Sequence, residues 1–224
     1  MSAKYRKVKN VMAKITSKDY HDYVIKNGKF IGEFEQMYQN VKDPWNHGAA
    51  DISSYDMALY LMDKYNICKK GGAIFDIGCG KGAFTHRIKK ACPKAKILAV
   101  DISETAVKKA KSQHGNSSID FRVMDIQKEY KSIAGKFDLI VVSNVMWYIL
   151  PDFSKIMNYL KGSLKNNGYV LIRQTFYKKG EQKYGNNIIS SPEDMVSLLS
   201  YNLVELIELN RTTVYEAVVL LQKN

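Results

Sequence analysis

One glycine-rich segment combines residue types and spacing that predict a specific chemistry. It reads Ile74-Phe-Asp-Ile-Gly-Cys-Gly-Lys-Gly-Ala-Phe84. Its glycines let the backbone turn tightly and let a ligand touch the main chain. The loop nearly satisfies the dinucleotide fingerprint, but the carboxylate of Asp76 at the preceding strand end would repel a pyrophosphate. The spacing therefore favours a ligand without phosphate that carries positive charge.

Two further carboxylates follow predicted strands. Asp101 ends the run Leu98-Ala-Val-Asp-Ile-Ser103, and an acidic side chain there can accept hydrogen bonds from both hydroxyls of a ribose. Asp125 follows the next strand. An isolated Asp after a strand is often only a turn residue or a helix cap, and Asp101 could simply start a helix. Together with the glycine loop, however, the two residues favour a ligand-binding role.

These features resemble the class I S-adenosylmethionine (SAM)-dependent methyltransferase motif (D/E)-x-G-x-G-x-G, and the resemblance covers residues 74 to 174. SAM has no phosphate, and its ammonium and sulfonium groups are cationic. The resemblance implies that Asp125 contacts the adenine amino group and that the fourth strand ends beside the methyl group. It implies these cofactor-binding residues: Trp45, Asp76, Gly78, Cys79, Gly80, Asp101, Ile102, Asp125, Ile126 and Ser143.

Several acceptor classes are disfavoured by motifs that this sequence lacks. After the fourth strand, Ser143-Asn-Val-Met146 has no proline, unlike the corresponding motif of adenine-N6 DNA methyltransferases. No cysteine lies there to act as the nucleophile of a cytosine-C5 enzyme, and no cluster of carboxylates there predicts a metal. We therefore expect a small-molecule acceptor, no metal, and neither a nucleic acid nor a membrane as partner.

The segment Glu35-Gln-Met-Tyr-Gln-Asn-Val-Lys-Asp-Pro-Trp-Asn-His47 resembles the Asp-Pro-Trp entry segment of the nodulation-type N-methyltransferases, which act on an amino sugar. In that group the N-terminal segment folds over the cofactor as a lid. The resemblance implies that Tyr38, Trp45 and His47 contact cofactor or substrate, although Trp45 could simply pack against the sheet. His47 is the preferred general base, with a purely polar contact as the alternative.

Residues after the fourth and fifth strands are candidates for the acceptor site. Tyr148 is a tentative catalytic residue, and basic side chains near the fifth strand could receive a phosphorylated or nucleotide-linked acceptor. A merely solvated basic loop is an equally good interpretation of the latter. The predicted substrate-binding residues are Tyr38, Asn144, Trp147, Arg173 and Lys178.

The elements that must position these residues alternate between strands and helices. The pattern predicts a Rossmann-like α/β three-layer sandwich with a seven-stranded, mainly parallel sheet and an antiparallel C-terminal hairpin. Residues 1–66 are predicted as a helical extension and lid, and residues 67–224 as the SAM-binding domain. Strands are expected at 73–77, 96–100, 118–123, 138–143, 169–174, 203–209 and 213–221; helices are expected at 8–15, 30–38, 55–62, 83–91, 104–112, 153–164 and 192–200.

Composition is that of a globular protein with no membrane-spanning run or secretory signal, so we expect a cytoplasmic monomer or homodimer. The three cysteines are expected to be reduced thiols. The net charge is +12, of which the first 29 residues carry +6. This bias motivates an RNA methyltransferase as an alternative, although a lysine-rich surface alone explains it equally well. A catalytically silent SAM-binding regulatory protein is a second alternative.

Overall fold

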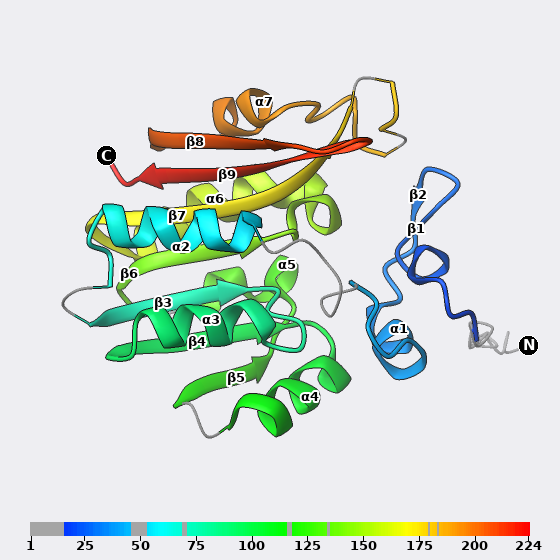
Figure 1. Cartoon of the computed structure of the whole chain (residues 1–224), viewed down its shortest axis with the longest axis horizontal. Coiled ribbons are helices and arrows are strands. Elements are labelled where there is room, and N and C mark those ends of the chain that lie inside the picture. Colours follow the sequence, from blue (N-terminus) through cyan, green and yellow to red (C-terminus); the bar gives the residue numbers. More distant parts are fainter. Residues whose placement is uncertain are drawn as a thin grey trace, which may run out of the picture.

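A seven-stranded sheet forms the centre of the computed structural model, which describes residues 16–45, 53–68, 71–115, 118–133, 135–178, 180–182 and 184–224. Its strand order is β5-β4-β3-β6-β7-β9-β8, and β9 runs antiparallel to both of its neighbours (Figure 1). The predicted Rossmann-like fold with its antiparallel hairpin is confirmed. The strands are β3 (Gly72–Ile77), β4 (Ala95–Asp101), β5 (Ile119–Val123), β6 (Phe137–Ser143), β7 (Leu164–Tyr177), β8 (Asn202–Asn210) and β9 (Val214–Gln222).

Helices cover both faces of this sheet, and the alternation of side chains along each strand feeds two separate cores. In β3, Phe75 and Ile77 join one core while Ile74 joins the other. Three of the described helices contribute buried side chains to the first core: α5 (Ile126–Glu129), α6 (Phe153–Leu160) and α7 (Pro192–Ser197). Three others contribute to the second core: α2 (Ser53–Lys64), α3 (Ala83–Ala91) and α4 (Glu104–His114). Burial on both faces explains the continuous apolar run of β6.

The N-terminal segment begins with a short 3-10 helix (Tyr20–Asp22) and a hairpin of β1 (Ile25–Lys26) and β2 (Lys29–Phe30). Between the strands, Asn27 and Gly28 have φ values of 52° and 71°, as a type I′ turn requires. The prediction of a helix from Phe30 is therefore wrong, because α1 (Phe34–Asn40) starts only after this hairpin. The helix expected over 8–15 lies outside the described residues.

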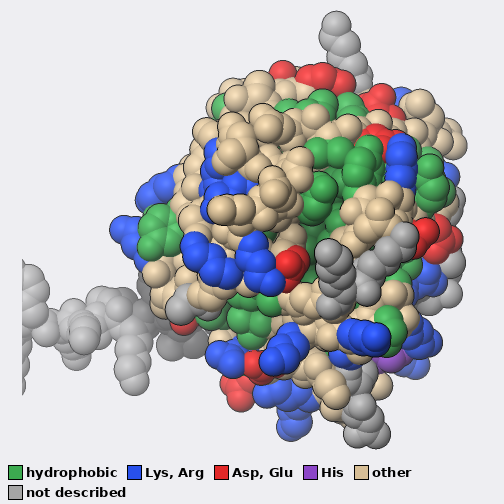
Figure 2. All heavy atoms as spheres, turned by 90° about the vertical axis from the view of Figure 1, so that its left-hand side faces the viewer, with side chains coloured by type: hydrophobic (Ala, Val, Ile, Leu, Met, Phe, Trp, Pro, Cys, Tyr) green, Lys and Arg blue, Asp and Glu red, His purple; other side chains and the backbone are tan. Residues whose placement is uncertain are grey.

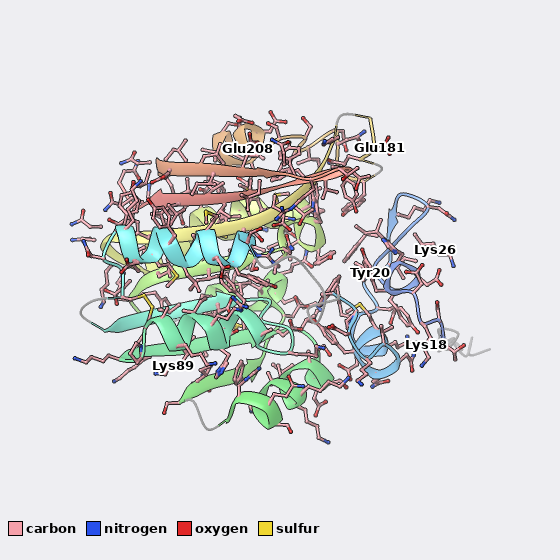
Figure 3. All side chains as sticks on the ribbon, in the orientation of Figure 1. Lys18, Tyr20, Lys26, Lys89, Glu181 and Glu208 are labelled. Carbon is pink, nitrogen blue, oxygen red and sulfur yellow. A yellow bond between two sulfur atoms is a disulfide. The ribbon has the colours of Figure 1, made fainter. Side chains whose placement is uncertain are left out.

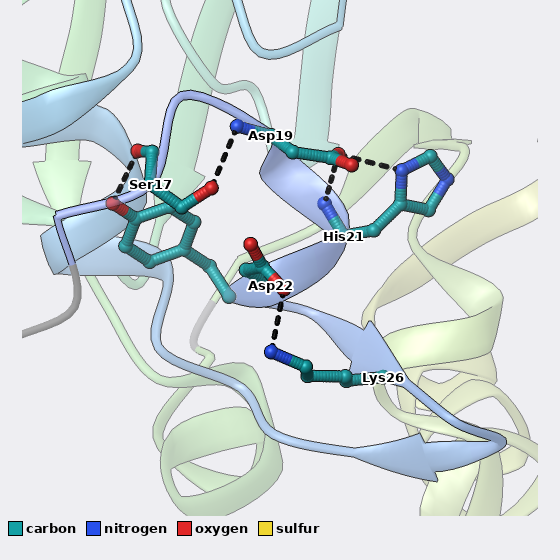
Figure 4. Close-up of polar contacts among 6 residues, drawn as sticks. Ser17, Asp19, His21, Asp22 and Lys26 are labelled. Atoms are coloured by element: carbon teal, nitrogen blue, oxygen red, sulfur yellow. Dashed lines mark hydrogen bonds and ion pairs between the residues drawn. The ribbon is translucent and has the colours of Figure 1, made fainter.

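Short-range polar contacts hold this segment in shape. Asp19 accepts a hydrogen bond from the backbone N–H of His21 at 2.9 Å and pairs with its ring, and Asp22 pairs with Lys26 at 2.7 Å (Figure 4). Tyr23 is buried beneath them and donates a hydrogen bond to the carbonyl of Ser17. All of these contacts are formed within the segment itself.

The helix predicted from Phe153 to Leu164 is shorter than expected. It ends at Leu160, and a 3-10 turn (Lys161–Ser163) leads directly into β7. An Asn-Gly pair often ends a helix, but Asn167 and the glycine after it lie inside β7. The β6–β7 register shifts beside them, and Asn167 has a φ of 62°. Pairing of Leu164 with Phe137 therefore ends the helix, and the Asn-Gly pair serves as an irregularity of the strand.

The expectation that all cysteines are reduced thiols is wrong for two of them. Cys68 and Cys92 form a disulfide with their Cα atoms 5.0 Å apart, within the usual range for such a bridge. Cys79, in the glycine loop, is free. The bridge joins the connection after α2 to the end of α3, two points that come together only when both helices pack on the same face of the sheet.

Charge is distributed rather than concentrated on the face away from the N-terminal segment. Figure 2 shows Lys and Arg side chains at several separate places of that face, interleaved with acidic and apolar side chains. The pattern suits a solvated surface better than a single polyanion-binding stripe. Among the described residues, the structure contains no helix with the length and apolarity that crossing a membrane requires.

Candidate active site

One cavity of about 430 Å³ lies at the carboxyl ends of β3, β4, β6 and β7. Ligands bind at this edge in open α/β sheets. Of the predicted residues, Lys178 is exposed and does not line the cavity, and His47 lies outside the described residues. The predicted residues that line it are Tyr38, Trp45, Asp76, Gly78, Cys79, Gly80, Asp101, Ile102, Asp125, Ile126, Ser143, Asn144, Trp147, Tyr148 and Arg173.

The glycine loop forms the floor of the cavity. Gly78 and Gly80 have φ values of 71° and 54°, a region that side chains other than Gly rarely adopt. A Cβ on Gly78 would lie 2.2 Å from Cγ2 of Val145, and one on Gly80 would lie 2.8 Å from the hydroxyl oxygen of Tyr38. Both glycines are therefore required by conformation and by space, and they leave the main chain open to a ligand.

Asp101 is held by the backbone around it. Its carboxylate accepts hydrogen bonds from the N–H of Gly80 at 2.8 Å and of Ser103 at 2.9 Å. Burial raises the pKa of Asp101 to about 6, although these two hydrogen bonds oppose the shift. Each carboxylate oxygen keeps a further lone pair, which suits two ribose hydroxyls. Ser103 itself caps α4, so the helix start and the candidate binding residue are distinct.

Asp76 is almost completely buried, with 2% of its surface exposed. One carboxylate oxygen accepts a hydrogen bond from the Thr85 hydroxyl at 2.6 Å. Burial raises the pKa of Asp76 to about 7, against the effect of that hydrogen bond. No described residue donates a hydrogen bond to the second oxygen, so Asp76 can take a cationic ligand group that stabilises its charged form.

Asp125 combines lining of the cavity with a local structural role. Its side chain accepts a hydrogen bond from the backbone N–H of Gln127 at 3.1 Å and so caps α5, and it pairs with Lys128 at 2.6 Å. The contacts of Asp125 are therefore those of a helix cap, one of the two roles that the sequence allowed. Its place on the cavity wall is compatible with the predicted adenine contact as well.

Arg173 is the buried cation of the site, with 6% of its surface exposed. Its Nε donates to the Ser143 hydroxyl at 3.0 Å and its Nη1 to the Ser54 hydroxyl at 3.1 Å, and its guanidinium lies over the Tyr55 ring. Burial lowers the pKa of Arg173, while Tyr55 and Glu216 raise it. No described residue accepts a hydrogen bond from Nη2, which leaves that nitrogen for an anionic ligand group.

Aromatic rings wall the other side of the cavity. Trp45 donates a hydrogen bond to the Tyr38 hydroxyl at 2.7 Å, and its ring centre lies 5.3 Å from that of Tyr20 and 5.8 Å from that of Tyr148. Phe34 and Tyr148 pack edge to face, with their ring centres 5.0 Å apart. Figure 3 shows Tyr20 on the N-terminal segment, which lies across from the sheet edge. Burial raises the pKa of Tyr148 far above its ordinary value, so its hydroxyl stays protonated at neutral pH.

A network of polar contacts attaches α1 to the side of the cavity that contains the glycine loop and the start of α4. The Glu35 carboxylate accepts hydrogen bonds from the Ser103 hydroxyl at 2.6 Å and from the backbone N–H of Thr105 at 3.1 Å. Lys81 pairs with Asp43 at 2.9 Å, at the other end of the segment. A carboxylate at the start of α4 is favourable there. The N-terminal segment is thus fastened over the glycine loop.

Trp147 and Asn144 connect the end of β6 to β7. The Trp147 ring nitrogen donates to the carbonyl of Thr175 at 2.9 Å, and the Asn144 side-chain oxygen accepts from the backbone N–H of the same residue at 2.9 Å. Asn144 has a φ of 55°, which Asn tolerates better than most residues. Both side chains therefore hold the sheet edge as well as lining the cavity.

Sequence reasoning missed several residues that line the cavity. Tyr20 and Phe34 come from the N-terminal segment, Tyr177 from the last residue of β7, and Glu216 from β9. Tyr20 and Phe34 precede the Asp-Pro-Trp entry segment of residues 35–47, so the resemblance did not mark them. Nothing in the local sequence marks Glu216, because only the antiparallel return of β9 brings it to the carboxyl end of β7.

Comparison with known proteins places this geometry in a family. A family described as "Methyltransferase domain" matches residues 68–211. The chain is 33% identical over 139 residues to a malonyl-[acyl-carrier protein] O-methyltransferase of Acetivibrio thermocellus, covering 58% of this chain and 48% of that protein. It is 33% identical over 144 residues to a ribosomal protein L11 methyltransferase of Thermotoga neapolitana, covering 62% and 52%. The chain thus spans about half the length of these curated relatives.

Solved structures show the same fold. The N-methyltransferase NodS from Bradyrhizobium japonicum WM9, in complex with S-adenosyl-L-homocysteine, superposes with a TM-score of 0.69 at 19% identity, over 84% of this chain and 97% of that chain. Magnesium protoporphyrin IX methyltransferase from Synechocystis PCC 6803 with bound SAM superposes with a TM-score of 0.59 at 16% identity, over 77% and 78%. At these identities the likeness concerns the fold.

Proposed function

The chain belongs to the methyltransferase-domain family, and we propose that it is a SAM-dependent methyltransferase that methylates a nitrogen or oxygen of a small molecule. The proposed acceptor is a sugar, a sugar nucleotide or a related glycan precursor. The malonyl-carrier and ribosomal-protein acceptors named for two relatives differ from each other. The class of acceptor is therefore inferred from the side chains that line the cavity.

The described residues fit SAM. The glycines leave the backbone open to a ligand, and Asp101 offers lone pairs to a ribose. The oxygen of Asp76 that accepts no hydrogen bond from the described residues suits the ammonium group. Asp125 and Ile126 would border the adenine. When bound, SAM supplies an electrophilic methyl group on a positively charged sulfur. The chain's own contribution is to hold the acceptor in line with that group and to keep water away.

The observation that carries the proposal is the enclosure of the acceptor side by aromatic rings. Trp45, Tyr148 and Tyr20 stand together over the end of β6, and α1 is fastened across the glycine loop. Such a wall suits a compact molecule that offers both apolar faces and hydroxyl groups, because tyrosine and tryptophan present both kinds of surface. The enclosure favours a small acceptor over a folded RNA.

Specific side chains receive specific proposed roles. Tyr148, which stays protonated, donates or accepts a hydrogen bond at the acceptor and does not serve as a phenolate base. Arg173 pairs with an anionic group of a phosphorylated or nucleotide-linked acceptor through its open Nη2. Asn144, Trp147 and Tyr38 complete the acceptor-side contacts. The general-base role of His47 remains a prediction, since this residue lies outside the described part of the chain.

Transfer of label from methyl-tritiated SAM tests the proposal. Purified protein is incubated with three separate acceptor pools: amino sugars and sugar phosphates, sugar nucleotides, and total RNA. Asp101→Ala serves as the binding-deficient variant, and Asp120→Asn, an exposed carboxylate on β5, as the matched control. We expect label in a sugar pool with wild type and Asp120→Asn. Asp101→Ala should lose at least tenfold in SAM affinity, about 1.4 kcal/mol.

The alternatives give different results in the same assay. Label in RNA alone, with binding that weakens steeply as salt rises, would support an RNA methyltransferase. Micromolar SAM binding without transfer to any pool would support a silent SAM-binding protein. Either result would contradict the proposed sugar-type acceptor.

A further inference from the structure

Glu216 of β9 places a further carboxylate on the wall of the cavity. It lies on β9 directly opposite Thr175 of β7. Because side chains alternate along a strand and paired residues share a face, Glu216 points to the same face as Arg173, Thr175 and Tyr177. All four residues line the cavity.

The carboxylate of Glu216 lacks the hydrogen bonds that a buried charge normally has. Its side chain is 16% exposed, and its Oε2 atom is buried without a hydrogen-bond partner among the described residues. The Nη2 of Arg211 approaches that oxygen only to 3.9 Å. No described residue donates a hydrogen bond to either oxygen. Burying a carboxylate in this way is costly unless a ligand supplies the missing donor.

Neighbouring side chains locate Glu216 along the depth of the cavity. Arg173 lies at the inner end, bonded to Ser143 where β6 ends next to the glycine loop. Tyr177 lies four residues farther along β7 than Arg173, at the exposed end of the strand. Tyr177 lines the cavity together with Tyr20 and Tyr148 of the aromatic wall. Glu216, opposite Thr175, falls between the inner cation and this outer wall, on the acceptor side.

We propose that Glu216 binds the methyl acceptor by accepting a hydrogen bond from the hydroxyl or amino group that is methylated, and that it takes the proton which this group loses. The acceptor atom forms a bond to the methyl carbon, the carbon–sulfur bond breaks, and its electron pair stays on sulfur. The proton moves to the carboxylate and then to solvent. The inference rests on the proposed function and adds a base within the described residues.

The test compares Glu216→Gln with Glu208→Gln, which alters an exposed carboxylate on the edge strand β8 (Figure 3). Glucosamine 6-phosphate is the probe, since it offers an amine, hydroxyls and a phosphate. Glu216→Gln should lower kcat at least 100-fold, the usual effect of losing a general base. Its Kd for SAM should stay within about threefold of wild type, because the cofactor residues are untouched. Glu208→Gln should leave all of these values unchanged.

Thermal unfolding of the same variants needs no acceptor. If Glu216 is kept for a ligand, replacing its charge, which Arg211 approaches only to 3.9 Å, by a neutral amide should leave the Tm unchanged or raise it. A clear fall in Tm, or full activity of Glu216→Gln, would overturn the proposal. If wild type does not methylate the probe, the proposed acceptor class fails, while the Tm comparison and SAM affinity still decide on Glu216.

Discussion

The guanidinium carbon of Arg173 lies 4.2 Å from the centre of the Tyr55 ring, although 118 positions separate the two residues in the chain. Tyr55 in turn stacks on Phe84 of α3, with ring centres 4.7 Å apart. A cation over an aromatic face is stabilised even when it is desolvated. The end of α2 that faces the cavity thus holds the buried Arg173 in place beside Ser143.

Substituting Arg173 by Met should show whether this residue binds the acceptor or the cofactor. We expect the KM for a phosphorylated acceptor to rise at least tenfold, about 1.4 kcal/mol, with the Kd for SAM within about threefold of wild type. Steady-state kinetics and calorimetric titration measure the two quantities. A larger loss of SAM affinity would instead assign Arg173 to the carboxylate of the cofactor. Arg173→Lys should not rescue, because Lys cannot bond Ser143 and Ser54 in the same geometry.

The raised pKa of Asp76, about 7, predicts that SAM binding depends on pH. A cationic group of the ligand requires the ionised carboxylate, so affinity should increase as pH rises from 5.5 to 7.5. Stability of the free protein should change in the opposite sense. Since the folded pKa lies above the unfolded value near 3.8, the folded state binds more protons between these values, and this group's contribution to stability is lost as pH rises toward about 7.

Calorimetric SAM titrations and thermal unfolding at several pH values check both trends. Thr85→Val removes the hydrogen bond that lowers the pKa of Asp76, and it should move the midpoint of SAM binding to higher pH. Asp76→Asn should flatten both profiles. An unchanged midpoint in Thr85→Val would show that another group controls the titration.

Gly80 and Tyr38 should be energetically coupled. Gly80→Ala places a Cβ 2.8 Å from the Tyr38 hydroxyl and forces Ala into a φ of 54°, so we expect a loss of about 1–3 kcal/mol in unfolding free energy. Tyr38→Phe removes the obstructing oxygen. The double variant should therefore be more stable than the sum of the single effects by at least ~0.5 kcal/mol.

Denaturant unfolding of the three variants and wild type gives this coupling energy. Gly162→Ala is the control, because a Cβ there would meet no atom within 4 Å. Strict additivity of Gly80→Ala and Tyr38→Phe would mean that the strained backbone, and not the contact with Tyr38, accounts for the requirement for Gly80.

The Cys68–Cys92 bridge predicts one reactive thiol per chain, that of Cys79, in denatured but unreduced protein. Thiol titration checks this number. Closing a loop of 24 residues should contribute about 3 kcal/mol, so Cys68→Ser should lower the Tm of the unreduced protein only. Three reactive thiols would contradict the bridge and would agree with the reducing cytoplasm expected from the sequence.

Much of the central domain could be predicted because each of its elements has a local signature. The glycine loop after an apolar strand predicts β3 and α3, and the helix expected at 83–91 coincides with α3. Order along the chain and the right-handed crossover rule then place the strand ends, with Asp76, Asp101 and Asp125, on one edge. Local patterns were less reliable where pairing decides. The irregularity at Asn167, beside the register shift between β6 and β7, shows this.

The strand–helix alternation, the glycine loop and the acidic residues at the strand ends could therefore be predicted from local patterns, because these features depend on neighbours in the chain. Tertiary structure decided which distant side chains meet. Packing of α2 on the sheet brings Tyr55 to Arg173, and helix packing brings Cys68 to Cys92. The antiparallel return of β9 brings Glu216 into the cavity. Such contacts depend on register and burial across the sheet, which no local residue pattern encodes.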